Sequence, residues 1–203
     1  VRWGGVARYV LQSLFDPVQQ ALLGSAIASA NLDTLMRAQG SEDAADDACH
    51  RLLHIMEAEP EPGAAAYTNK IMQFASPYVA ERVVEQLDER DRADLVRFLT
   101  SAAAADPRLV GAVRGQLWEY YVHRCLRKGG RFDVKNLGTG ETATWGLPTH
   151  ALQSFVVWGD VADVGDDAYA VPVKANLPAL DAFTVGPTRL FQVTVARRSH
   201  PIN

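Results

Sequence analysis

The residues of this chain that could do chemistry are concentrated near its end, in two short segments. The first, residues 176–181, has the sequence Asn-Leu-Pro-Ala-Leu-Asp and ends in the carboxylate of Asp181; the second, residues 190–195, is Leu-Phe-Gln-Val-Thr-Val. Both segments are predicted to be strands, and side chains alternate between the two faces of a strand. Gln192 and Thr194 are therefore expected to share one face, with the apolar residues on the other.

A carboxylate beside a glutamine on a neighbouring strand predicts a site for a divalent metal ion. Mg²⁺ prefers hard oxygen ligands in near-octahedral geometry and usually keeps several waters. Asp181, the amide oxygen of Gln192 and a backbone carbonyl would suffice to hold one ion. Such an ion polarises a phosphodiester and lowers the pKa of a bound water, which then attacks phosphorus. This is the arrangement of the metal site in restriction-endonuclease-like nucleases.

One residue departs from that arrangement. Such nucleases generally carry a lysine two residues after the Glu or Gln, where it stabilises developing charge, and this chain has Thr194 there. A substitute cation is expected from Lys174, Arg197 or Arg198. The simpler alternative is a strand pair whose aspartate caps a turn, and the local pattern leaves both interpretations open.

Charge is unevenly distributed along the 203 residues. The net charge of −4 would repel a nucleic acid, yet residues 108–135 are rich in arginine and lysine. Within that segment, Arg124, Arg127 and Lys128 are the candidates for contact with phosphates. The alternative is a solvated helix face. No apolar stretch approaches the roughly 20 residues that span a bilayer, so no membrane segment is expected.

The periodicity predicts an α+β chain whose first half is helical. Asp16 and Pro17 have the types of a helix cap and a first helical residue. A domain boundary is expected at Asp106-Pro107, which gives domains 1–106 and 107–203. The predicted helices cover residues 6–14, 18–38, 41–56, 76–87 and 91–105.

The second half is predicted to contain one helix followed by a mixed or mainly antiparallel set of strands. The helix covers residues 109–127 and ends at Gly129-Gly130. Residues 138–140, Gly-Thr-Gly, are expected to turn. The predicted strands cover residues 132–137, 153–158, 168–173 and 190–195, in addition to 176–181.

Several segments, in order, resemble the Crinkler effector family and the related retrotransposon hot spot proteins. Residues 3–11, Trp-Gly-Gly-Val-Ala-Arg-Tyr-Val-Leu, are similar to the family's Trp-Gly-Gly-Val-Pro-Arg-Tyr-Val-Leu motif, with Ala7 in place of proline. The other similar segments are residues 74–79 in the helical middle, the block of 114–119, His123 and 129–132, and the closing block of 176–181, 191–195 and 200–202.

The resemblance implies a two-part organisation, in which a P-loop NTPase of the AAA+/STAND type precedes a restriction-endonuclease-like domain of the PD-(D/E)xK class. Residues 1–106 would be the helical lid of an NTPase whose nucleotide-binding core lies upstream. ATP or GTP would then bind only in the intact protein, with Arg8 as a nucleotide-sensing arginine. Residues 107–203 would be the nuclease-like domain, which is expected to continue beyond residue 203.

For the site, the resemblance implies that Glu119, Asp181 and Gln192 occupy the family's catalytic positions, with Thr194 beside them and Mg²⁺ as cofactor. The chain would then be part of a secreted effector that acts on DNA in a host nucleus. Without the resemblance, only a soluble intracellular protein is expected.

Two alternatives to cleavage remain open. In the first, the domain is catalytically inactive and binds DNA or host nuclear proteins through its basic helix. In the second, the chain only senses the state of the upstream NTPase domain.

Overall fold

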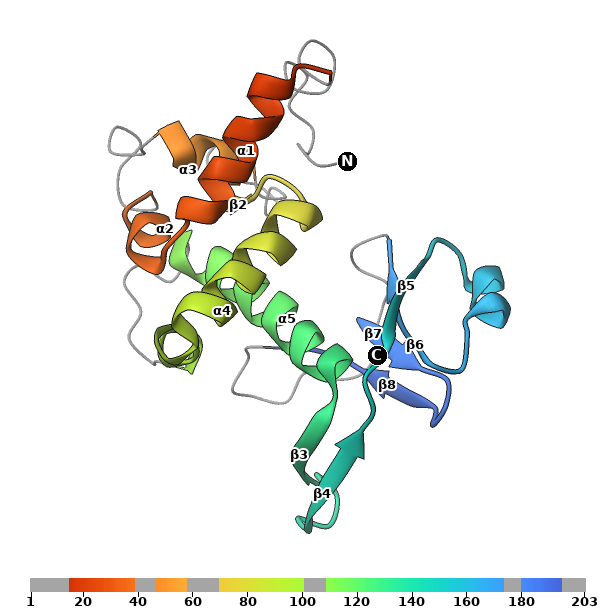
Figure 1. Cartoon of the computed structure of the whole chain (residues 1–203). Coiled ribbons are helices and arrows are strands. Elements are labelled where there is room, and N and C mark those ends of the chain that lie inside the picture. The colour runs from red at the N-terminus through yellow and green to blue at the C-terminus, as the bar shows by residue number, and fades with distance from the viewer. Residues whose placement is uncertain (1–14, 39–46, 58–69, 101–108, 174–179, 195–203) are drawn as a thin grey trace, which may run out of the picture. The chain divides into compact units, whose positions relative to one another are not determined.

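The computed structural model describes residues 15–38, 47–57, 70–100, 109–173 and 180–194 (Figure 1). The chain divides into two compact units, Val1–Tyr121 and Val122–Asn203, and the division falls inside helix α5 (Leu109–Lys128). The expected boundary at residues 106 and 107 lies outside the described residues. Both helices and small sheets are present, so the broad α+β prediction is confirmed.

The first unit is mainly helical, as predicted. It contains the elements α1 (Pro17–Ser29), α2 (Leu32–Ala38), α3 (Asp47–Leu52), β1 (Leu53–Glu57), β2 (Lys70–Phe74), α4 (Pro77–Thr100) and the first part of α5. The predicted cap of α1 is confirmed: the carboxylate of Asp16 accepts the backbone N–H groups of Val18 (2.9 Å) and Gln19 (3.4 Å).

The predicted helix over residues 18–38 is in fact two helices. The helix α1 ends at Ser29, and Ala30 leaves the helical conformation. The side chain of Asn31 then caps α2, because its Oδ1 accepts the N–H of Thr34 at 2.8 Å. A local side-chain cap therefore interrupts an apolar pattern that is continuous in the sequence.

The prediction of one helix over residues 41–56 was wrong in its second half. The helix α3 ends at Leu52, and β1 pairs antiparallel with β2, with Leu53 opposite Phe74 and Glu57 opposite Lys70. The strand β2 was not predicted at all. Pairing between segments distant in sequence overrides a helical spacing that is weak over so few residues.

The helix α4 contains the break that the sequence predicts between its two halves. Asp91 has non-helical backbone angles (φ −152°, ψ 52°), so two helices join there. At the start, the Oγ of Ser76 accepts the N–H of Val79 at 3.2 Å and Pro77 takes the first helical position. Buried apolar residues line one face on both sides of the break, including Val83 and Leu95.

The helix α5 agrees with its prediction at both ends. It covers Leu109–Lys128, and Gly129 follows with a φ of 72°, a conformation that favours glycine. The position is also crowded, since a Cβ at Gly129 would lie 2.5 Å from the carbonyl oxygen of Pro148. The end of α5 is therefore fixed against the backbone of Leu147 and Pro148.

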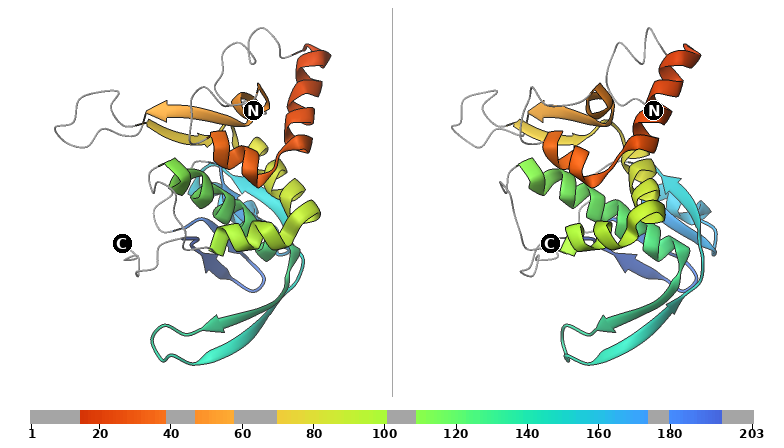
Figure 2. Two further views of the ribbon diagram at one scale, coloured as in Figure 1. Left: turned by 90° about the vertical axis from the view of Figure 1, so that its left-hand side faces the viewer. Right: turned by 60° about the vertical axis from the view of Figure 1, so that its left-hand side comes forward.

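The second unit contains a hairpin and a four-stranded sheet. The hairpin pairs β3 (Gly130–Lys135) with β4 (Thr142–Leu147) and is drawn as a curved two-stranded ribbon in Figure 2. The predicted strand over 132–137 is confirmed for residues 132–135, the turn begins at residue 137, one before the predicted 138–140, and β4 was missed. The sheet has the order β5 (Ala151–Phe155), β6 (Ala168–Pro172), β7 (Ala182–Thr184) and β8 (Arg189–Phe191).

The sheet is mixed, as predicted, but its last strands are shorter than expected. The strands β5 and β6 are parallel, whereas β6–β7 and β7–β8 are antiparallel. Asp181 does not close a strand, because it lies immediately before β7; residues 174–179 are outside the described residues. Residues 192–194 follow β8 without strand pairing, so the prediction of a strand through Gln192 and Thr194 was wrong.

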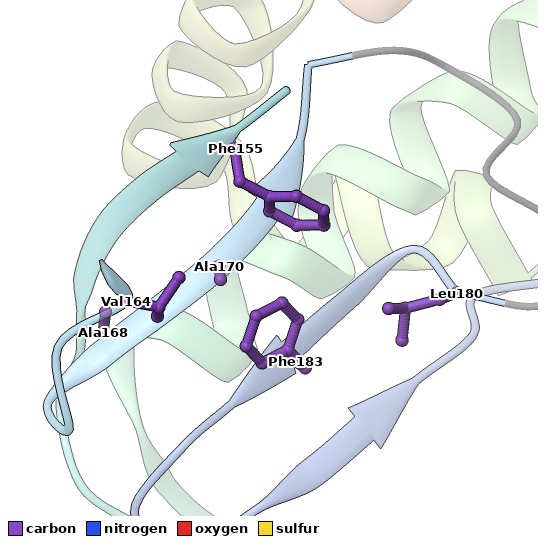
Figure 3. Close-up of a cluster of buried hydrophobic side chains, with 6 residues drawn as sticks. All are labelled: Phe155, Val164, Ala168, Ala170, Leu180 and Phe183. Carbon is purple, nitrogen blue, oxygen red and sulfur yellow. The ribbon is translucent and has the colours of Figure 1, made fainter. Parts of the chain in front are cut away.

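Alternation along the strands gives the sheet two buried faces. One face carries the cluster of Phe155, Val164, Ala168, Ala170, Leu180 and Phe183 shown in Figure 3, in which the rings of Phe155 and Phe183 lie 5.5 Å apart, edge to face. Tyr169 and Thr184 are paired across β6 and β7 and point to the opposite face. Both of these residues are almost fully buried, at 1% and 0% exposure.

Candidate functional site

Asp181 is held at the open end of the β7–β8 hairpin by two backbone hydrogen bonds. Its N–H donates to the carbonyl of Phe191 at 2.9 Å, and its Oδ2 accepts the N–H of Val193 at 2.5 Å. Because a carboxylate offers about four lone-pair positions, this one bond leaves most of its capacity for other groups. The side chain is therefore oriented by the backbone without being saturated by it.

A histidine and a tyrosine meet on the face of the sheet opposite the hydrophobic cluster. The Nδ1 of His123, on α5, lies 2.7 Å from the hydroxyl of Tyr169, on β6, and the two rings pack edge to face with centroids 5.8 Å apart. The ring of Phe191 lies 5.7 Å from that of Tyr169. Tyr169 thus links the last turns of α5 to the strand end that anchors Asp181.

The charge of Asp181 acts on both members of this pair. Burial lowers the pKa of His123, and the negative charge of Asp181 opposes that effect. Burial raises the pKa of Tyr169, the charge of Asp181 raises it further, and the charge of Arg127 lowers it. Both side chains are therefore neutral near pH 7, and a single hydrogen bond joins them in a direction set by the histidine tautomer.

The three predicted phosphate-binding residues have different environments at the end of α5. Arg124 is buried at 9% exposure, whereas Lys128 is exposed. Arg127 is half-buried, and its charge acts on Tyr169. Lys128 is therefore presented to solvent, and Arg127 belongs to the surroundings of the tyrosine–histidine pair.

Two further predicted site residues, Gln192 and Thr194, follow β8 near Asp181, and their side chains face solvent. Gln192 is the residue between the two anchors of Asp181, and its side chain is exposed, as is that of Thr194. Phe191 and Val193 are half-buried between them, so the predicted alternation is confirmed for residues 191–194 even though strand pairing has ended. The roles of Gln192 and Thr194 remain predictions.

Glu119 lies in the first unit, on α5, and its side chain is exposed. Burial raises the pKa of Tyr120 to about 12, with smaller contributions from the charges of Glu119 and Glu81. Asp181, the other predicted carboxylate, lies in the second unit. Arg8 lies outside the described residues, as do the expected substitute cations Lys174, Arg197 and Arg198.

The residues that surround Asp181 only partly fit a metal site. Within the described ranges, no group of three or more His, Cys, Asp and Glu side chains is arranged to hold an ion. One carboxylate with a neighbouring glutamine still fits Mg²⁺, which is commonly bound through one or two carboxylates, waters and the phosphates of a substrate. The donor set is therefore suited to an ion shared with a phosphate rather than to a closed protein cage.

Sequence reasoning singled out Asp181 but not the tyrosine–histidine pair on which its charge acts. His123 entered only as part of a segment that resembles the Crinkler family, and Tyr169 was not singled out. The sequence signal that could have identified His123 is its spacing of four residues from Arg127, which places both residues on one face of α5. Nothing in the sequence around Tyr169 indicates that its hydroxyl meets a histidine 46 residues away.

Comparison with known proteins gave no match among family models, curated proteins or solved structures. Among the helices of the described residues, none combines the length and apolar character that a membrane crossing requires.

Proposed function

We propose that the second unit is a nuclease-like domain that acts on the phosphodiesters of DNA through Asp181. The observation that supports it best is the fixed carboxylate, whose charge acts on both members of a hydrogen-bonded pair formed by the buried Tyr169 and the half-buried His123. Burying polar groups costs stability, and such clusters are enriched at functional sites. An antiparallel meander of β6, β7 and β8, with the carboxylate before its middle strand, is also compatible with a restriction-endonuclease-like fold.

In this proposal the carboxylate of Asp181 and the amide oxygen of Gln192 hold Mg²⁺ together with a phosphate of the substrate. The bound metal supplies Lewis-acid polarisation of the phosphate and a more acidic water. Asp181 is oriented for this role by the N–H of Val193. Hydrolysis consumes one water, breaks one phosphorus–oxygen ester bond and leaves a phosphomonoester and a hydroxyl end, with Thr194 as the proposed assisting residue.

We further propose, from the resemblance alone, that the chain is part of a Crinkler-like effector. In this proposal residues 1–106 belong to the lid of an upstream NTPase domain that binds ATP or GTP in the intact protein, with Arg8 sensing the nucleotide. Secretion and delivery to a host nucleus belong to the same proposal.

A second candidate function is binding without cleavage, to DNA or to host nuclear proteins. Two observations favour it: Thr194 replaces the expected lysine, and exposed basic side chains continue from the end of α5 into β3. These are Lys128, Arg131 and Lys135. In that case the fold and its basic surface would be retained while the chemistry is lost.

Nicking of supercoiled plasmid by the 203-residue chain with Mg²⁺ or Mn²⁺ tests the proposal. We expect Asp181→Asn and EDTA each to reduce the nicking rate by at least about 100-fold, because a first ligand contributes more than the 10–100-fold typical of outer-shell groups. The matched control is Asp163→Asn, since Asp163 is exposed in the same unit and accepts from Gln153 through its backbone carbonyl. Absence of nicking by the folded wild type would favour the binding function.

A further inference from the structure

The end of α5 carries a positively charged side chain, whereas Thr194 stands where a nuclease would carry a lysine. Residues 123 and 127 are four apart and share a helix face. Because the imidazole of His123 reaches the hydroxyl of Tyr169 at 2.7 Å, this face of the last turns of α5 is directed at the sheet. Arg127 therefore lies one turn beyond His123 on the face that meets Tyr169.

The backbone around Arg127 is fixed by the segment that follows β4. The carbonyl of Arg127 accepts the N–H of His150 at 2.9 Å, and the carbonyl of Lys128 accepts the Oγ of Thr149 at 2.9 Å. Gly129 then ends the helix in a conformation that leaves no room for a Cβ. The Cα of Arg127 is consequently held in place, and only its side chain needs to adjust to a ligand.

Charges of opposite sign act on one hydroxyl group from two different elements. Asp181, before β7, and Arg127, at the end of α5, both influence the ionisation of Tyr169. Interactions of this kind weaken with distance, so each of the two charged groups lies within reach of the Tyr169 hydroxyl. By contrast, Arg124 is buried, and Lys128 is one position further round the helix and exposed.

We propose that Arg127 is the cation of the Asp181 site and contacts the phosphate on which Asp181 acts. This inference rests on the proposed function and names the residue that replaces the missing lysine. A guanidinium suits the role because its planar fork binds two phosphate oxygens at once, and it remains charged at any working pH. Arg127 stabilises charge and positions the phosphate, without any need to transfer a proton.

The test is binding of a fluorescein-labelled 12-base-pair DNA duplex, followed by anisotropy in Ca²⁺ at fixed salt, for the wild type and three variants. We expect Arg127→Ala to weaken binding by about tenfold or more, the loss of one charged hydrogen-bonded contact. Arg127→Lys should restore part of the affinity, because the charge returns without the fork. Arg189→Ala is the matched control in β8, because the guanidinium of Arg189 lies over the ring of Trp145, 4.6 Å from its centroid. It removes the same charge and should change affinity by less than about threefold.

The outcomes separate this inference from the proposed function. An equal loss in Arg127→Ala and Arg189→Ala, or no loss in Arg127→Ala with its thermal unfolding unchanged, would overturn the role of Arg127. If Arg127→Ala instead lowers the unfolding temperature with no selective loss of DNA affinity, the role of Arg127 is purely structural. That outcome would also overturn the proposed phosphate contact. If Arg127→Ala selectively loses DNA affinity and the wild type never nicks plasmid, Arg127 is sustained as the phosphate contact and cleavage is rejected.

Discussion

At the scale of single residues, the charge of Asp181 acts on a hydrogen-bonded tyrosine–histidine pair. Tyr169 is 1% exposed and still places its hydroxyl against the imidazole of His123. The carboxylate of Asp181 is oriented by one backbone N–H while its charge acts on both members of this pair. A cap that only closed a turn would not require these polar neighbours, so we interpret the group as a site.

The pH dependence of stability should report the tyrosine–histidine pair. His123 has a lowered pKa, so as the pH falls below about 6.5 the unfolded chain takes up a proton that the folded chain resists, and stability falls. Tyr169 has a raised pKa, so above about pH 10 the unfolded chain loses a proton that the folded chain retains, and stability falls again.

The variant Tyr169→Phe isolates the alkaline part of this behaviour. At pH 7.5 it should cost about 1–2 kcal/mol of unfolding free energy, because His123 loses its hydrogen-bond partner. The difference from the wild type should shrink as the pH rises to 11, since the phenylalanine variant no longer has this tyrosine to ionise. Urea unfolding at the two pH values measures this difference in unfolding free energy. Tyr120 contributes equally to both proteins, so it cancels. A difference that does not change with pH would contradict the account.

At this scale the sequence singled out the carboxylate of Asp181 but not the side chains on which its charge acts. Asp181 was recognisable because a carboxylate near an alternating strand is a local pattern. The contact between His123 and Tyr169 joins residues 46 positions apart, and it depends on how α5 packs against β6. The sequence named Arg127 only as one of three candidate phosphate contacts on a basic helix, and its proposed role as the site cation depends on the same packing.

At the scale of elements, helices were predicted well where local signals determine them. The cap at Asp16, the start of α4 after Ser76 and the end of α5 at Gly129 are each set by residues within one turn. The strands β1, β2, β4 and β7 were missed because their existence depends on partners distant in sequence. For the same reason the last strand is shorter than the predicted 190–195 and ends before Gln192.

A comparison of two glycines tests whether the end of α5 is fixed as described. Gly129 and Gly140 both have positive φ, at 72° and 78°, but only Gly129 would place a Cβ against backbone oxygens. Gly140→Ala should cost about 1–2 kcal/mol of unfolding free energy from the backbone conformation alone. Gly129→Ala should cost a further 1–3 kcal/mol or so from overpacking.

Chemical denaturation of both variants beside the wild type measures these costs. Equal losses for the two glycines would show that the carbonyls of Leu147 and Pro148 do not crowd the end of α5. A larger loss at Gly129 with reduced DNA affinity would connect the fixed helix end to the position of Arg127.

At the scale of the whole molecule, the chain forms two compact units, and the described contacts of the site lie in one of them. His123, Arg127, Tyr169, Asp181 and Val193 all belong to the unit Val122–Asn203. The α+β class was predictable from composition and periodicity. The finer restriction-endonuclease-like class and the relation to Crinkler effectors remain proposals, because no comparison with known proteins bears on them.

The central claim is that Asp181 is the metal-binding centre of this unit, and paramagnetic broadening by Mn²⁺ tests it most directly. In amide spectra of the labelled protein with a short DNA duplex, sub-equimolar Mn²⁺ should broaden the signals of Asp181 and Val193 selectively. Signals from the β3–β4 turn at Thr139 should stay sharp, and Asp181→Asn should abolish the effect. Uniform broadening, or the same pattern in Asp181→Asn, would contradict the account.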